Sequence, residues 1–228
     1  TMRLSEACCV GELLDTLPSE AISPVLNVGS STGHFRKNEQ PHIDLHIFEP
    51  LCKRNVVVIH VDLKQADGVD YAGDVLDEGF QHKLRSLHPK LIMCSNLLEH
   101  LTDPFSFLQA CAEILEPGGY LLITGPRSYP YHLDPIDTMY RPGPTEIQRI
   151  FPDYESVFGK VISSTTYLQD LSRRYSTWKI ASKFLSDTLK MPLRFVFNFD
   201  KSKASYHRYL WLFRPYTSTV VLLRKPKK

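Results

Sequence analysis

Short apolar runs alternate with amphipathic segments through residues 25–124. Four runs have the length and composition of buried strands: residues 25–28, 56–61, 91–95 and 120–124. Three segments between them are predicted to be helices: residues 44–54, 80–87 and 104–115. Because parallel strands need a crossover connection, usually a helix, this alternation favours a parallel sheet with helices on both faces. The sequence therefore predicts an α/β, doubly wound fold.

Two helices have recognisable boundaries. Asp103 is a natural N-cap and Pro104 suits the first helical position, so a helix is expected to begin there. Near the N-terminus, apolar residues spaced three and four apart before Pro18 predict a helix within residues 1–24.

Beyond residue 124 the alternation is interrupted. Residues 125–144 contain five prolines and are expected to form a loop. The remaining expected elements are a helix at 145–150, strands near 157–163 and 217–223, and a helical, basic insertion at 165–214. We expect residues 1–228 to form a single domain.

The bulk composition indicates a soluble globular protein. Hydrophobic residues make up 43% and charged residues 23% of the chain, and no apolar run reaches the roughly 18–20 residues of a membrane span. The five cysteines form no CxxC pair, which argues against a disulfide framework or a zinc site. These features favour a reduced, cytoplasmic protein.

Polar or glycine residues follow the predicted strands at their ends. They are Gly29–Gly33, Asp62, Gly73–Asp74 and Ser95–Asn96. Ligands of open α/β sheets bind beyond the carboxyl ends of the strands. Each feature alone has a structural explanation, such as a tight turn, a solvated aspartate or an Asx-turn. Their common position favours one ligand site.

At these residues the chain resembles the class I S-adenosylmethionine-dependent methyltransferases with a Leu-Glu-His signature, similar to methyltransferase type 11. The resemblance covers residues 25–126, through the glycine loop, the acid at Asp62, the Gly-Asp-Val at 73–75, and Leu98-Glu99-His100. It implies a mostly parallel, seven-stranded Rossmann-like sheet and S-adenosylmethionine as cofactor.

The resemblance also implies the cofactor-binding residues. They are Asn27, Gly29, Ser30, Ser31, Gly33, Asp62, Leu63, Gly73, Asp74, Val75, Ser95, Asn96 and Leu97. Asn27 stands where the family usually has an acid, and Ser31 where a second glycine is common. The connection from Asp62 to Asp74 is short, so it is expected to lack a full helix.

The acceptor is expected to bind against residues 125–144. His132, with Asp134, or alternatively His100, is the candidate general base for a hydroxyl acceptor. No metal site is predicted, because one histidine and two aspartates over six positions are sparse for zinc. The predicted reaction is methyl transfer to a small-molecule or glycan acceptor, with O-methylation favoured over N-methylation.

Charge is divided unevenly along the chain. Residues 1–159 carry 12 Lys/Arg against 22 Asp/Glu, and residues 160–228 carry 15 against 3. The basic, aromatic part is expected to be a helical cover over the sheet, while an anionic acceptor, peripheral membrane contact or a homodimer stay open. Nucleic acid is disfavoured, since the acidic part would repel phosphates.

Two other functions remain open. A non-catalytic S-adenosylmethionine-binding module is compatible with Asn27 and Ser31. A nicotinamide-dependent oxidoreductase shares the sheet, but Ser31 and Arg36 replace glycines of the dinucleotide-binding pattern.

Overall fold

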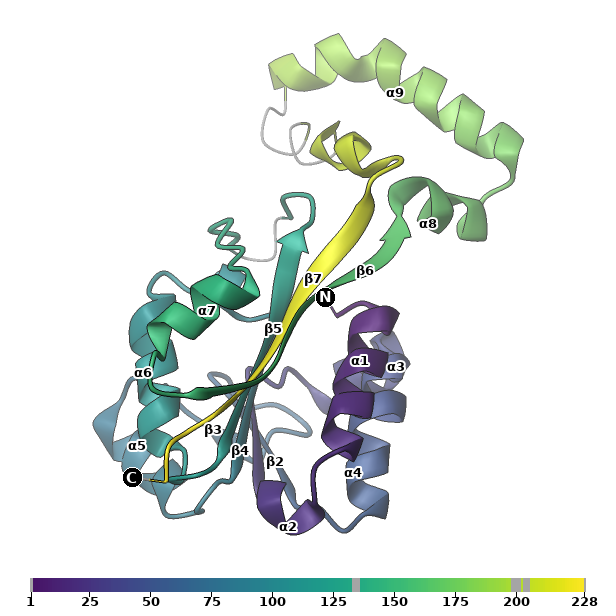
Figure 1. Ribbon diagram of the computed structural model, residues 1–228. Coiled ribbons are helices and arrows are strands. Elements are labelled where there is room, and N and C mark those ends of the chain that lie inside the picture. The colour runs from purple at the N-terminus through teal and green to yellow at the C-terminus, as the bar shows by residue number, and fades with distance from the viewer. Residues whose placement is uncertain (1, 133–135, 198–201, 203–205, 228) are drawn as a thin grey trace.

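The computed structural model describes residues 2–132, 136–197, 202 and 206–227, and the side chains among them except those of residues 191–197. Figure 1 shows a central twisted sheet, helices on both of its faces, and a helical segment that extends beyond the sheet.

The sheet confirms the predicted fold class. Its seven strands are β1 (Val25–Val28), β2 (Val58–Asp62), β3 (Tyr71–Ala72), β4 (Leu91–Ser95), β5 (Tyr120–Ser128), β6 (Glu155–Thr166) and β7 (Pro215–Arg224). They are arranged in the order β3-β2-β1-β4-β5-β7-β6. The pairs from β3 to β5 are parallel, and β7 runs antiparallel to both β5 and β6. The sheet is thus mostly parallel.

Helices cover both faces of this sheet. They are α1 (Leu4–Asp15), α2 (Ser19–Ile22), α3 (Pro41–Ile43), α4 (Glu49–Lys53), α5 (Glu78–Arg85), α6 (Pro104–Ile114), α7 (Pro144–Ile150), α8 (Tyr167–Arg174) and α9 (Thr177–Phe197). Single-turn or π-helical segments are η1 (Phe35–Glu39), η2 (Asp44–Phe48), η3 (Leu98–His100) and η4 (Arg208–Trp211). Helices α1, α3 and α4 pack on one face and α5, α6 and α7 on the other (Figure 1).

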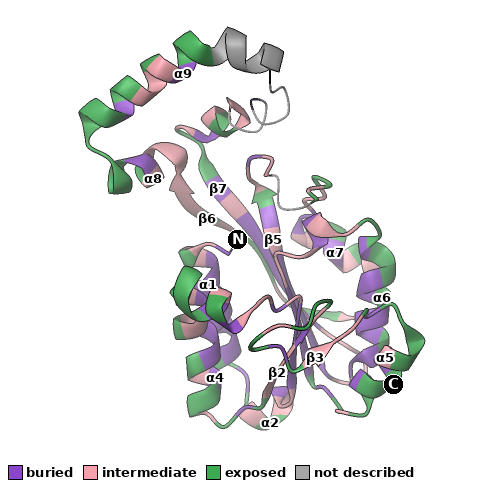
Figure 2. Ribbon diagram, turned by 180° about the vertical axis from the view of Figure 1, so that it is seen from behind, coloured by how far each residue is buried: buried purple, intermediate pink, exposed green. Residues whose placement is uncertain are grey.

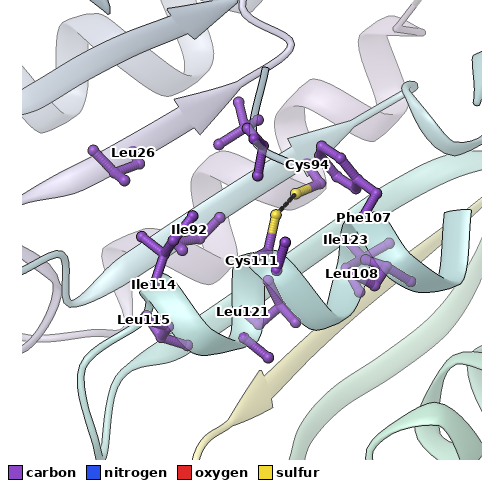
Figure 3. Close-up of a cluster of buried hydrophobic side chains, with 14 of the residues drawn as sticks. Leu26, Ile92, Cys94, Phe107, Leu108, Cys111, Ile114, Leu115, Leu121 and Ile123 are labelled. Atoms are coloured by element: carbon purple, nitrogen blue, oxygen red, sulfur yellow. Dashed lines mark hydrogen bonds between the residues drawn. The ribbon is translucent and has the colours of Figure 1, made fainter. Parts of the chain in front are cut away.

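The core consists of two apolar layers separated by the sheet. Figure 3 shows one of them, in which α6 packs against β4 and β5. The thiols of Cys94 and Cys111 meet there at 3.8 Å, and all five cysteines are free. Asp103 accepts a hydrogen bond from the Ser106 N–H, which confirms it as the N-cap of α6.

The segment between β2 and α5 differs from the predicted loop. Residues 71–72 pair with residues 61–62 and form the edge strand β3. The pairing is only two residues long, so the sequence carries no alternation that would mark it. The connection contains no helix, as expected from its length.

The basic C-terminal segment does not cover the sheet, and this prediction is wrong. Helices α8, α9 and η4 come between β6 and β7 in the sequence. They project beyond the carboxyl edge, which is the edge of the sheet formed by the carboxyl ends of the parallel strands (Figures 1 and 2). We call residues 167–214 the arm. Its aromatic stripe is partly exposed, with Trp178 at 81% and Leu185 at 64%. The sequence predicts a helical, basic and aromatic segment, but not which surface that segment packs on.

No helix in the described part of the chain has the length and apolarity that crossing a membrane requires.

Candidate active site

Sheet register brings the predicted ligand-binding positions to one edge. Val28 is in register with Val61 of β2 and with Cys94 of β4. Asp62 is in register with Ala72 of β3. The residues that follow these four strands therefore lie side by side along the carboxyl edge, as the sequence predicts.

The loop after β1 is attached to the end of β2. Gly29 has a positive φ of 72°, which glycine adopts without strain, and Ser31 also has a positive φ of 55°. The Ser31 N–H donates to the Asp62 carboxylate at 2.8 Å. Asp62 also accepts from the Lys64 N–H at 3.3 Å. Asp62 thus holds the loop in the conformation that Ser31 alone would disfavour.

Arg36 holds the same loop through hydrogen bonds to its backbone. It was not among the predicted site residues. Its guanidinium is buried and donates to the carbonyls of Ser30, Ser31 and Gly68 at 2.8, 2.7 and 2.6 Å. Burial lowers the pKa of Arg36, although nearby aspartates oppose the shift. Arg36 therefore joins the loop after β1 to the loop after β2.

Gly68 lets these two loops approach closely. It has a φ of 74°, and a Cβ there would lie 2.7 Å from the backbone of Gly33. A side chain at this position would push the loops apart.

Asn27 lies inside the sheet and is 5% exposed. Its amide is 3.1 Å from Nδ1 of His60 on the neighbouring strand β2. Burial lowers the pKa of His60 to about 4, so the ring is neutral at pH 7 and Nδ1 accepts from the amide. The amide is thus already engaged with the adjacent strand.

Residues after β3 and β4 complete the edge. Asp74 accepts from the Leu76 N–H at 2.9 Å in a local turn, and Val75 is buried beside it. Leu97 lies over Gly29, where a Cβ would come within 2.8 Å of its side chain. Leu63, by contrast, is 67% exposed. Among the predicted cofactor-binding residues, Leu63 therefore has the least structural support.

Helix α1 contributes a carboxylate that the sequence did not reveal. Glu6 is fully buried and accepts a hydrogen bond from the Asn96 amide at 2.7 Å. Asn96 has a φ of 50°, and the bond to Glu6 fixes its side chain. Glu6 is a polar residue within a predicted helix, and nothing in its local pattern separates it from a solvated one.

A second cluster lies just beyond, where η3 meets the segment after β5. The Thr138 N–H and hydroxyl both donate to the Glu99 carbonyl, at 2.9 and 3.1 Å. Nδ1 of His100 lies 2.6 Å from the Ile136 carbonyl, so it carries the proton and donates. These bonds hold residues 136–141 against η3.

Asp137 organises this cluster. Its buried carboxylate accepts from the N–H groups of His132 and Met139, and from the Arg141 guanidinium at 2.8 Å. Burial by itself would raise the pKa of Asp137, but these donors outweigh it and lower the pKa. Nδ1 of His132 is 2.8 Å from the same carboxylate.

His132 and His100, the two alternative candidates for the general base, lie together in this cluster. Their ring centroids are 5.2 Å apart, and burial lowers the pKa of His132. Asp137 is the described carboxylate beside His132; Asp134, the predicted partner, lies outside the described residues. Prolines and polar residues marked residues 125–144 in the sequence. Spacing alone could not decide whether Asp134 or Asp137 is the partner of His132.

Glu99 lies beside both histidines. It is 1% exposed, Oε1 is 3.7 Å from Nε2 of His100, and burial raises the pKa of its carboxyl. Within the described residues, neither carboxyl oxygen of the Glu99 side chain has a hydrogen-bond partner.

The arm contacts the loop that carries His132. The Tyr131 N–H donates to Nδ1 of His207 at 3.0 Å, and the Trp211 indole N–H donates to the Ser128 hydroxyl at 3.0 Å. Arg3, before α1, forms an ion pair with Asp170 of α8 at 2.9 Å. The arm therefore lies beside the cluster of His100, His132 and Asp137.

Known proteins with related sequences are methyltransferases. A family profile described as a methyltransferase domain matches residues 4–167. Ubiquinone biosynthesis O-methyltransferase from Citrobacter koseri is 36% identical over 73 residues, which are 32% of this chain and 27% of that protein. The Acinetobacter baylyi protein of the same name is 27% identical over 79 residues, 33% of this chain and 32% of its own length. The chain thus matches about a third or less of these relatives.

Solved structures share the whole fold. A SAM-dependent methyltransferase from Archaeoglobus fulgidus superposes with a TM-score of 0.53 and 17% identity, covering 96% of this chain and 94% of that one. The [4+2]-cyclase SpnF superposes with a TM-score of 0.51 and 14% identity, covering 98% and 82%. At such identities the likeness shows the fold, and the reaction has to be argued from the site.

Proposed function

Because the chain belongs to the methyltransferase-domain family and shares its fold with a SAM-dependent methyltransferase, we propose that it methylates a hydroxyl oxygen of a small molecule or glycan. The observation that supports an oxygen acceptor is the cluster of His100, His132 and Glu99 beside the carboxyl edge. A hydroxyl must lose its proton on methylation, and this cluster offers groups that can accept or direct it.

S-adenosylmethionine is the cofactor, and when bound it supplies an electrophilic methyl group on its sulfonium. The predicted residues along the carboxyl edge are proposed to hold it. Asp62 would accept from the ribose hydroxyls, and Asp74 from the adenine amino group. The Ser30–Ser31 backbone, fixed by Arg36, would face the methionine part. Leu97 and Val75 offer apolar contacts.

The acceptor is proposed to bind at the carboxyl edge, beside the rings of His100 and His132. Asp137 beside Nδ1 of His132 favours the tautomer with the proton on Nδ1, which leaves Nε2 able to accept a proton. Holding the acceptor oxygen in line with the methyl group is the larger contribution, which can amount to about 7–11 kcal/mol of the barrier.

The test is methyl transfer from labelled S-adenosylmethionine to an acceptor panel: a catechol, a monosaccharide and a primary amine. We expect the hydroxyl acceptors to gain one methyl, detected by mass. His132→Gln should lower kcat by about 10²–10⁴, the usual contribution of a general base, without changing S-adenosylhomocysteine affinity. His88→Gln, at an exposed histidine, is the matched control.

Amine methylation that is indifferent to His132→Gln would contradict the oxygen assignment. Tight S-adenosylhomocysteine binding without methyl transfer to any compound in an extract of the protein's own cells would favour the non-catalytic module. Preferential NADH binding would instead favour an oxidoreductase.

A further inference from the structure

Glu99 is a buried carboxyl group whose neighbour among the described residues is His100, with Nε2 3.7 Å from Oε1. Glu99 is 1% exposed, and among the described residues neither of its carboxyl oxygens accepts a hydrogen bond. Its Oε2 faces Gly125, where a Cβ would lie 3.8 Å away, and its Oε1 faces His100. Burying a carboxylate without a hydrogen-bond donor is unfavourable unless a cation or a donor compensates it.

In each of the two histidines Nδ1 faces an oxygen of the protein. Nδ1 of His100 donates to the Ile136 carbonyl, and Nδ1 of His132 lies 2.8 Å from the Asp137 carboxylate. Such carbonyl and carboxylate partners on the far nitrogen orient metal-binding histidines and leave Nε2 with its lone pair. The rings come from two different loops, so no sequence spacing marks the pair.

We propose that Glu99, His100 and His132 bind one divalent cation of the first transition series, and that the ion holds the acceptor oxygen. This inference rests on the proposed O-methylation. One candidate ligand atom from each side chain lies within 4.8 Å of the other two. With metal–ligand bonds of about 2.0–2.2 Å, bound ligands end roughly 3–3.5 Å apart, so the ion draws the three side chains inward.

The donor set selects the kind of ion. Two imidazoles and one carboxylate suit Zn²⁺, Mn²⁺, Fe²⁺ or Co²⁺, whereas Mg²⁺ and Ca²⁺ prefer oxygen ligands. Three protein ligands leave coordination positions open, and these can take a hydroxyl oxygen of the acceptor. There the ion lowers the hydroxyl pKa. Because Nε2 of His132 is then a ligand of the ion, the proton passes to water instead of to His132. The new O–C bond forms as the C–S bond breaks, and S-adenosylhomocysteine leaves.

The experiment titrates the chelator-treated 228-residue chain with Co²⁺, whose visible absorption reports nitrogen ligation, and confirms the stoichiometry with Zn²⁺ by calorimetry. One ion per chain is expected. His100→Ala, His132→Ala and Glu99→Gln should each weaken Co²⁺ binding by about 10–100-fold or more, the usual range for losses at metal sites. Mg²⁺ should not displace Co²⁺ at equal concentration.

The exposed pair His88 and Glu116 provides a matched control. Nδ1 of His88 lies 2.8 Å from Oε1 of Glu116, the same distance as between Nδ1 of His132 and the Asp137 carboxylate. His88→Ala and Glu116→Gln should bind Co²⁺ as the wild type does. Glu99→Gln has a second signature: without metal it should raise the Tm, because a buried charge is removed, and with Zn²⁺ it should lose the Tm increase that the wild type gains.

Failure of this inference can be told apart from failure of the proposed function. Unchanged Co²⁺ affinity in the three variants, or no stoichiometric ion in the wild type, overturns the metal site even if methyl transfer proceeds. An ion bound through the three residues supports it, even if no hydroxyl compound is methylated. S-adenosylhomocysteine binding by each variant shows that the variant is folded.

Discussion

At the scale of single residues, the site depends on polar groups whose burial sets their charge. His60 is the clearest case, because burial lowers its pKa to about 4 and its neutral ring accepts from Asn27. In the unfolded chain a histidine binds a proton near pH 6.5, whereas His60 in the fold does not. The unfolded state therefore binds more protons as the pH falls, and stability decreases in this interval.

We expect the free energy of unfolding to fall between pH 6.5 and pH 4, with His60 contributing up to about 3 kcal/mol of the loss. His60→Gln keeps a side-chain acceptor for Asn27 and removes the titration, so its stability should decline less over this range. Urea unfolding at several pH values measures the difference. Equal pH profiles for His60→Gln, the exposed control His88→Gln and the wild type would refute this role.

Arg36 is the residue on which the cofactor loop most depends. Arg36→Met removes three charge-assisted hydrogen bonds to backbone carbonyls, and we expect a loss of about 2–4 kcal/mol of stability. The dissociation constant of S-adenosylhomocysteine should also rise about tenfold or more, measured by calorimetry. Arg36→Lys should recover only part, because one ammonium cannot span three carbonyls. Unchanged affinity in Arg36→Met would show that the loop needs no such support.

At the scale of elements, the arm is more than an appendage to the sheet. His207 of the arm contacts Tyr131, next to His132, and Trp211 of η4 contacts Ser128 at the end of β5. Helix α9 exposes Trp178. The family profile ends at residue 167, so the arm falls outside it. Elements that vary on a shared fold commonly carry its specificity.

We therefore predict that Trp211→Phe, which keeps the ring but removes the N–H bond to Ser128, raises the KM for the acceptor and leaves S-adenosylhomocysteine affinity unchanged. Steady-state kinetics together with a cofactor titration separate the two effects. The control is Trp178→Phe on the exposed face of α9, which should alter neither. A change in cofactor affinity alone would show that the contact between Trp211 and Ser128 supports the cofactor site instead of the acceptor site.

At the scale of the whole molecule, the cofactor edge is assembled from four strand ends and two loops. A ligand that binds only this assembled edge stabilises the fold by mass action. Asp62 is the group shared by the loop after β1 and the loop after β2.

S-adenosylhomocysteine at 100 times its Kd should stabilise the protein by about 2.7 kcal/mol, seen as a rise in Tm. Asp62→Ala should abolish most of this rise. Glu116→Ala is the control: Glu116 is paired with the exposed His88 and precedes β5, at the opposite edge of the parallel strands, so this variant should keep the ligand-induced increase. A full increase in Asp62→Ala would mean that the ligand binds elsewhere.

Much of the fold could be predicted because its signals are local. Buried strands, helix caps and glycines at strand ends depend on residues close in the chain, so β1, β4 and α6 were placed to within a residue or two. The same local signals put Gly29, Asp62 and Asn96 at the ends of strands. Parallel topology then required them to share one edge.

The tertiary structure decided what depends on contacts between distant segments. Glu6 meets Asn96 across 90 positions, and Arg36 reaches Gly68 across 32, so no pattern in the sequence marks either pair. The sequence predicts that the arm is helical and basic, but it does not predict that the arm projects beyond the sheet. Likewise Glu99 and His132 come from separate loops, and only folding shows that a carboxylate without a partner lies beside two imidazoles. Local chemistry thus set the elements and the family, while long-range packing fixed the electrostatics of the site.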